Sequence, residues 1–147
     1  MKLTQYLPAL LAAGLLAGCA ASNDGASQFV DVTLIASQVN QGQTGMAAFV
    51  DKGPSTGLDF TISGVPGGAS SPLQLLSFIY PGACASLGSQ PAYAMNQDTQ
   101  AFEGQAGWIM SKEVPVALGT LLAGKYAVVV RSSPADGNQN IFCGDIR

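Results

Sequence analysis

The stretch GLDFTISG at residues 57–64 decides the fold class of this chain. In it the apolar residues Leu58, Phe60 and Ile62 alternate with an aspartate, a threonine and a serine. A period of two residues places the apolar side chains on one face of a β-strand and the polar ones on the other. The pattern is typical of an antiparallel sheet with one face in the core and one face in water.

Further strand-like runs lie on both sides of this stretch. They are rich in apolar residues and are bounded by Gly, Pro, Asn or Ser, and they occupy residues 29–37, 45–51, 73–80, 107–112, 125–132 and 140–146. Turn-forming stretches such as Pro66-Gly67-Gly68 separate them. No apolar stripe with a 3.6-residue period is long enough for a major helix. We therefore predict one all-β domain over residues 29–147, an antiparallel β-sandwich or barrel.

Residues 1–18 have the layout of a secretory signal peptide. A positive charge at Lys2 precedes an apolar stretch at residues 7–16, and small residues then lead to Cys19. The apolar stretch is short for a membrane-spanning helix and contains a proline and a glycine, so we favour export with cleavage over a retained helix.

Leu16-Ala17-Gly18-Cys19 resembles the lipobox of bacterial lipoproteins. This resemblance implies that Cys19 becomes the N-terminus and carries diacylglycerol and a further acyl chain such as palmitate, enough for stable membrane anchoring. Ala20 resembles the residue that leaves such proteins at the outer membrane, on its periplasmic or surface face. Residues 19–28 are small and polar, and we expect them to form a flexible tether.

Composition argues against two classes of function, namely nucleic-acid binding and catalysis or metal binding that depends on histidine. Charged residues make up 10% of the chain, and Asp and Glu (9) outnumber Lys and Arg (6). Nucleic-acid binding needs a basic stripe, so we expect no nucleic-acid partner. Histidine is absent, which removes the commonest general base and the commonest transition-metal ligand.

Two cysteines, Cys84 and Cys143, remain once Cys19 is lipidated. In the oxidising compartment that an export signal implies, such a pair is expected to form a disulfide, with two buried free thiols as the alternative. No CxxC motif is present, which argues against redox catalysis.

The positions of these cysteines resemble those in copper/zinc superoxide dismutase. Cys84 follows a predicted strand in Pro-Gly-Ala-Cys, and Cys143 lies in Cys-Gly-Asp-Ile near the C-terminus, where the family has Cys-Gly-Val-Ile. The segments at 57–68 and 121–131 are similar to family segments in the same order. The resemblance covers about residues 29–147 and implies a Greek-key sandwich with the disulfide between Cys84 and Cys143.

The metal ligands of that family are missing here. Its copper histidines correspond to Ser77, Ile79 and Arg131, and its arginine near the last cysteine corresponds to Asn140. Residues 85–93 contain neither His nor Asp for zinc. Copper redox chemistry needs several histidines bound directly to the copper ion. The resemblance therefore implies a dismutase-like domain without metal, cofactor or catalytic residues.

Three other chemistries are less well supported. Without histidine, a serine nucleophile lacks its usual base, which argues against a hydrolase. Asp98 and Glu103 could suggest paired carboxylates or a calcium loop, but the regular spacing of oxygen ligands is missing and a solvated loop fits better. Met46, Met95 and Met110 could hold Cu(I), although scattered methionines usually fill gaps in a core.

The aromatic residues allow two interpretations. Trp108 and its neighbour Ile109 are expected to be buried. Tyr80, Tyr93 and Tyr126 could form a surface contact patch, but we favour core packing for them.

The sequence thus predicts a non-enzymatic lipoprotein of the bacterial cell envelope that presents a rigid β-sandwich as a binding or structural module. A copper-handling protein is the alternative. The expected partners are the membrane, through lipid on Cys19, and an unidentified envelope or host protein.

Overall fold

The computed structural model describes residues 28–147, so the signal peptide, Cys19 and most of the tether lie outside the described residues. Within this range the chain is almost entirely β-structure. The strands are β1 (Phe29–Ala36), β2 (Thr44–Asp51), β3 (Thr56–Ile62), β4 (Leu75–Ala83), β5 (Ser86–Leu87), β6 (Tyr93–Ala94), β7 (Phe102–Gly104), β8 (Gly107–Val114), β9 (Tyr126–Ser132) and β10 (Asn140–Ile146). The helical segments are α1 (Leu118–Ala123) and the 3-10 turns η1 (Gln38–Asn40) and η2 (Pro134–Asp136).

Every strand predicted from the sequence is confirmed, with bounds shifted by a few residues. The short strands β5, β6 and β7 and the helix α1 were not predicted. Segments of two or three residues are too short to display a hydrophobic period, and a six-residue helix shows less than two turns of one.

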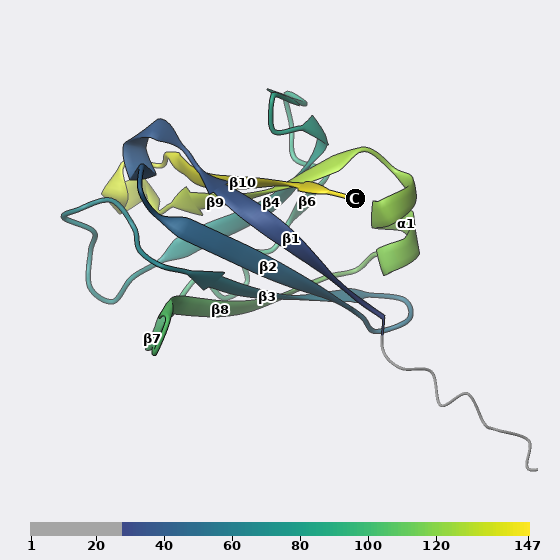
Figure 1. Cartoon of the computed structure of the whole chain (residues 1–147), viewed down its shortest axis with the longest axis horizontal. Helices are drawn as coiled ribbons and strands as arrows, with labels where there is room; N and C mark the ends of the chain where they lie inside the picture. The colour runs from purple at the N-terminus through teal and green to yellow at the C-terminus, as the bar shows by residue number, and fades with distance from the viewer. Residues whose placement is uncertain (1–27) are drawn as a thin grey trace, which may run out of the picture.

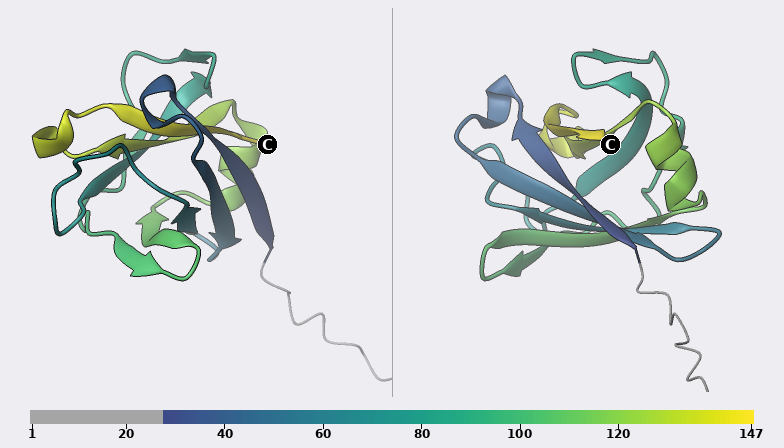
Figure 2. Two further views of the ribbon diagram at one scale, coloured as in Figure 1. Left: turned by 60° about the vertical axis from the view of Figure 1, so that its left-hand side comes forward. Right: turned by 45° about the vertical axis from the view of Figure 1, so that its right-hand side comes forward.

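The strands pair in the order β5-β4-β9-β10-β1-β2-β3-β8-β7, with β6 added beside β4, and all of the pairings between them are antiparallel. The sheet bends into two layers, one of β1, β2, β3 and β8 and one of β4, β9 and β10 (Figures 1 and 2). The layers join where β1 meets β10, at the pairs Ile35–Cys143 and Ala36–Phe142. The predicted all-β antiparallel architecture is therefore confirmed in sandwich-like form.

The core lies between the two layers and follows the alternation seen in the sequence. Leu58, Phe60 and Ile62 of β3 are at most 1% exposed, whereas Asp59 between them is exposed. Apolar residues of the opposite layer, including Val128 of β9, complete the core. Fully burying side chains of this size contributes roughly 1.5–3 kcal/mol each, which makes the alternation the main determinant of the fold.

Helix α1 covers one end of the sandwich (Figure 1). Leu118 and Leu121 are three residues apart, so they lie on one face of the helix, and both are fully buried in the core. Among residues 28–147 no helix is both long and apolar enough to cross a membrane.

Asp136 anchors the long connection between β3 and β4. Ser70 donates hydrogen bonds from its backbone N–H (2.8 Å) and its hydroxyl (2.6 Å) to Oδ1 of Asp136, and Ser133 donates to Oδ2 (3.1 Å). These bonds stabilise the carboxylate, and the hydroxyl of Ser70 makes the largest contribution to lowering the pKa of Asp136.

The expected disulfide between Cys84 and Cys143 is confirmed, with the two Cα atoms 5.8 Å apart. It ties the segment after β4 to the last strand. The backbone N–H of Cys84 also donates to Oδ1 of Asp145 (2.7 Å), whose other oxygen pairs with Arg147 (3.3 Å). The bridge and this hydrogen bond together fix the end of β4 against β10.

Candidate functional site

The positions that correspond to the copper ligands of the resembled family do not converge. Ser77 and Ile79 are fully buried on the core side of β4. Arg131 is half-buried, and its guanidinium lies over Phe78, which projects from the opposite face of β4. These three side chains therefore cannot bind one metal ion.

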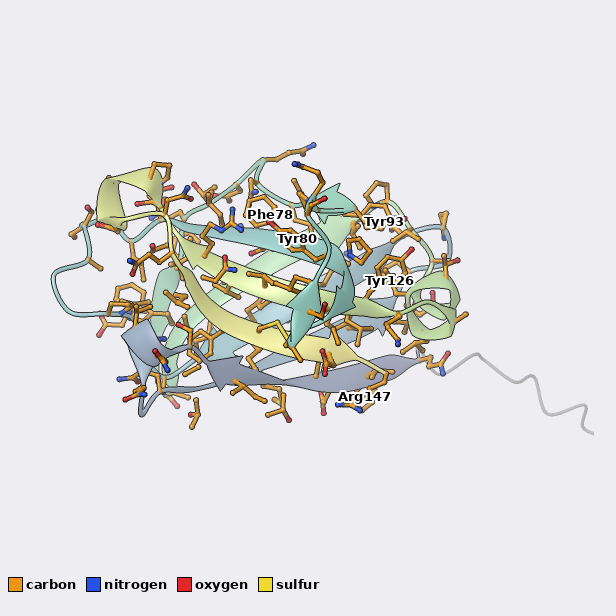
Figure 3. All side chains as sticks on the ribbon, turned by 90° about the horizontal axis from the view of Figure 1, so that it is seen from above. Phe78, Tyr80, Tyr93, Tyr126 and Arg147 are labelled. Carbon is orange, nitrogen blue, oxygen red and sulfur yellow. A yellow bond between two sulfur atoms is a disulfide. The ribbon has the colours of Figure 1, made fainter. Side chains whose placement is uncertain are left out.

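Arg131 instead joins two aromatic rings on the outside of β4. Its guanidinium carbon lies 4.7 Å from the Phe78 ring centroid, and Nη2 donates to the hydroxyl of Tyr80 (2.8 Å). Nε donates to Oδ1 of Asn140 (2.7 Å). Figure 3 shows Phe78 and Tyr80 next to each other. Because the cation is already stacked and hydrogen-bonded, this cluster is a structural contact between β4, β9 and β10.

The three methionines do not lie together either, and of the two carboxylates Asp98 lies in a turn while Glu103 is exposed on β7. Met95 and Met110 are buried in the core, whereas Met46 is 45% exposed on the outside of β2. Oδ1 of Asp98 accepts the backbone N–H of Gln100, two residues along the chain (3.0 Å), as in an ordinary solvated turn. Within residues 28–147 no group of three acidic, cysteine or histidine side chains could hold a metal ion.

Core packing is observed for Tyr93, Tyr126 and Trp108 but not for Tyr80 or Ile109. Tyr80 is buried, but on the outer side of β4 against Arg131, whereas Tyr93 and Tyr126 pack against the core with ring centroids 6.4 Å apart (Figure 3). Trp108 is half-buried on the core side of β8. The prediction that Ile109 is buried was wrong: adjacent residues of a strand point to opposite faces, so Ile109 points outward and is 44% exposed.

The layer formed by β1, β2, β3, β8 and β7 carries an exposed apolar row on its outer face, the face turned away from the core. The strand register places Phe102, Ile109, Thr61, Met46 and Thr33 beside one another, one from each strand. Directly paired residues point to the same face of a sheet. With strands about 4.8 Å apart, the row is about 19 Å long.

Strand β1 extends this apolar row along its own length. Ile35 and Phe29 lie on the same outer face and are 69% and 66% exposed. They are six residues apart, about 20 Å in a strand. The outer face thus carries five large exposed apolar side chains within an area of roughly 400 Å² that also includes Thr33, Thr61 and the exposed Asp31.

Acidic residues adjoin the apolar row. The neighbouring row of the register runs from Asp31 through Ala48 to Asp59, and both carboxylates are exposed. Glu113 lies two residues further along β8 than Ser111, on the same face. The acidic row therefore follows the apolar row on its Phe29 side, and Asp31 lies between the apolar row and Phe29.

A cleft of about 650 Å³ lies between β8 and the segment that follows β6. Its lining includes Lys52, Met95, Asp98, Lys112 and Glu113. Glu113 pairs with Lys52 (3.1 Å) and accepts a hydrogen bond from Ser55 (2.7 Å), and these contacts lower the pKa of Glu113, that of Ser55 being the largest cause.

Lys112 is the unusual residue of this cleft. It occupies a core-facing position of β8, between Met110 and Val114, and is only 8% exposed. Nζ donates a hydrogen bond to the main-chain carbonyl of Asp98. Burial lowers the pKa of Lys112, and the negative charge of Asp98 partly offsets this. In the sequence, Lys112 stands where the alternation of the strand predicts an inward-facing apolar residue. This position was not recognised from the sequence.

Comparisons of the chain with protein-family models, with curated proteins and with solved structures found no match. The site must therefore be interpreted from its own geometry.

Proposed function

We propose that this protein is a lipoprotein of the bacterial cell envelope, anchored through Cys19, whose β-sandwich binds another envelope protein through the outer face defined above. The apolar row on that face carries the proposal. Three of its members, Met46, Ile109 and Phe102, are large apolar residues that are 44–53% exposed. Ile35 and Phe29 of β1 add two more exposed apolar side chains to the same face. Exposed apolar area of this extent is costly to leave in water and favours a partner that covers it.

The partner that fits this face is a folded protein with an apolar surface and basic residues at its rim. Asp31 and Asp59 lie in the row next to the apolar one, and within the described residues neither forms an ion pair. Complementary positive charge would mainly increase the rate and specificity of association. A patch of about 400 Å² is about half of a standard interface per partner, so we expect reversible binding.

Binding suits the described residues better than catalysis. The hydroxyls of Ser55 and Ser70 donate to Glu113 and Asp136, but the pKa of each carboxylate is lowered. A carboxylate with a lowered pKa is a weak general base, so neither pair is suited to activate a nucleophile.

We further propose that the sandwich is a Greek-key domain of the superoxide dismutase type that lacks the metal ligands. Two observations support this. Strands β1, β2 and β3 follow one another as neighbours, and β10 returns from far along the chain to lie beside β1. In addition, the disulfide joins the segment after β4 to the last strand, which agrees with the position of the family bridge.

The proposed anchor sets how far the domain reaches from the membrane. Residues 19–28 separate Cys19 from β1. A fully extended chain of that length spans about 30 Å, and a flexible one averages about 17 Å. A protein bound to the same membrane is thus within reach.

Photo-crosslinking in intact cells tests the proposed binding face. A photoreactive amino acid placed at Ile109 is expected to give a discrete adduct with a second protein, and Met46→Lys in the same chain should abolish it. The matched control carries the probe at Ala123, which is exposed on α1. Equal adducts from both positions, or an adduct of twice the chain mass, would contradict binding of a different envelope protein by this face.

A further inference from the structure

The cleft beside Lys112 has the features of a second ligand site, which borders the outer face at Ser111 and Glu113. A lysine side chain that is 92% buried rarely occurs without a partner of opposite charge. Within residues 28–147 the structure has two ion pairs, Lys52–Glu113 and Arg147–Asp145, so no carboxylate there pairs directly with Lys112. An ammonium group has three N–H donors, and one of them is used by the carbonyl of Asp98.

The nearby carboxylates make their direct hydrogen bonds and ion pairs with other groups. Glu113 is the next residue of the strand, points to the opposite face and binds Lys52 and Ser55. The carboxylate of Asp98 accepts the backbone N–H of Gln100. A buried cation with free donors that faces a cleft is best satisfied by an anion supplied from outside the chain.

The charges around the cleft limit that anion to a single negative charge. Lys52 pairs with Glu113, so Lys112 is the lining cation that has no carboxylate in direct contact. A monoanion would match the charge of Lys112, whereas a dianion such as phosphate would place a second negative charge close to both Asp98 and Glu113. A monoanion next to Lys112 is attracted by the ammonium group and is repelled less strongly by the two carboxylates.

The walls of the cleft show what the rest of the ligand should be. The apolar surface of the cleft comes from Met95, Ala94 and Pro115. Hydrogen-bonding groups at its border come from Ser111 and Gln97. A volume of about 650 Å³ is suitable for a small organic molecule or for the last residues of a peptide.

We propose that this cleft binds a monocarboxylate with a short apolar body, its carboxylate paired with Nζ of Lys112. The group comes either from a small organic acid or from the C-terminus of a peptide. The carboxylate would be held from the core side of β8 by Lys112, and Ser111 and Glu113 of the outer face lie at the border of the cleft.

Titration of the full chain, held in detergent micelles, with butyrate tests the proposal by NMR. Butyrate is expected to cause saturable shifts of the amide signals of Ser111, Lys112 and Glu113, whereas neutral butyramide and inorganic phosphate should not. Lys112→Met should weaken butyrate binding at least tenfold, and Lys125→Met, which alters an exposed lysine, should leave it unchanged. Equal binding by the Lys112→Met chain, or tighter binding of phosphate, would overturn the proposal.

A second measurement needs no substitution. A bound carboxylate stabilises the charged ammonium, so the pKa of Lys112, followed through its side-chain NMR signals, should rise when butyrate is saturating. An unchanged pKa would refute the pairing.

A tripeptide with a free C-terminus, compared with its amidated form, separates the two sources of the carboxylate. Tighter binding of the free peptide than of butyrate indicates a peptide C-terminus. Tighter binding of butyrate indicates a small organic acid.

Discussion

Nζ of Lys112 donates a hydrogen bond to the carbonyl of Asp98 and thereby connects β8 to the segment that follows β6. The two segments are not paired as strands, and both contribute to the lining of the cleft. It places a cation at a core-facing position, and its effect on stability can be measured.

Replacing Lys112 by methionine should not destabilise the protein. We expect the free energy of unfolding to increase by up to about 1 kcal/mol at neutral pH. The reason is that a buried charge without a direct ion pair is exchanged for an apolar side chain of similar length. Folding lowers the pKa of Lys112 below 10.5, so the unfolded chain retains this proton more strongly. The stability of the wild type should therefore rise relative to Lys112→Met as the pH approaches 10.5. Urea unfolding of both chains between pH 7 and 10 checks this, and a constant difference would contradict it.

Removal of the disulfide should cost about 4 kcal/mol, because the bridge closes a loop of 59 residues in the unfolded chain. The double variant Cys84→Ala, Cys143→Ala should show this loss in urea unfolding. In a chain with Cys19→Ala, denatured without reductant, thiol titration should find no reactive thiol. Two reactive thiols per chain would show that the bridge does not form.

Acid should loosen the connection between β3 and β4. The pKa of Asp136 lies below 3.8 in the folded protein, so its contribution is complete above that value and is lost as the pH falls through the lowered pKa. Asp136→Asn should lower the melting temperature at pH 7 and flatten its decline between pH 5 and pH 2. Parallel melting curves of the two proteins over this range would contradict the role of Asp136.

Cys19→Ala should release the protein from the membrane fraction, because the proposed lipid on Cys19 is its anchor. Fractionation of cells grown with a clickable fatty acid provides the measurement. The wild type should carry label and sediment with membranes, and the variant should do neither. The matched control, Cys84→Ala with Cys143→Ala, should still carry label; a labelled Cys19→Ala chain would argue against lipidation at this residue.

Much of the fold could be predicted, because Leu58, Phe60 and Ile62 record in one short segment which face of a strand is buried. The cysteine pair was also predictable, since only two cysteines remain after Cys19. The cleft was not predictable. The position of Lys112 between Met110 and Val114 indicates that it faces inward, but the sequence does not show that Asp98 lies beside it.

A shift of one residue separates prediction from observation at one other place, because Ile109 was expected inside and lies outside. In a run of continuous apolar residues the side-chain period is hidden, so the sequence does not show which residues point inward.

The sequence by itself determined that the chain folds as antiparallel strands, where most of them lie and which cysteines are bridged, because alternation and residue counts are local properties. Only the tertiary structure decided that Met46, Ile109 and Phe102 share one row and that Lys112 meets Asp98. Such neighbours are set by the hydrogen-bond register between strands far apart in the chain, and that register depends on how the whole core packs.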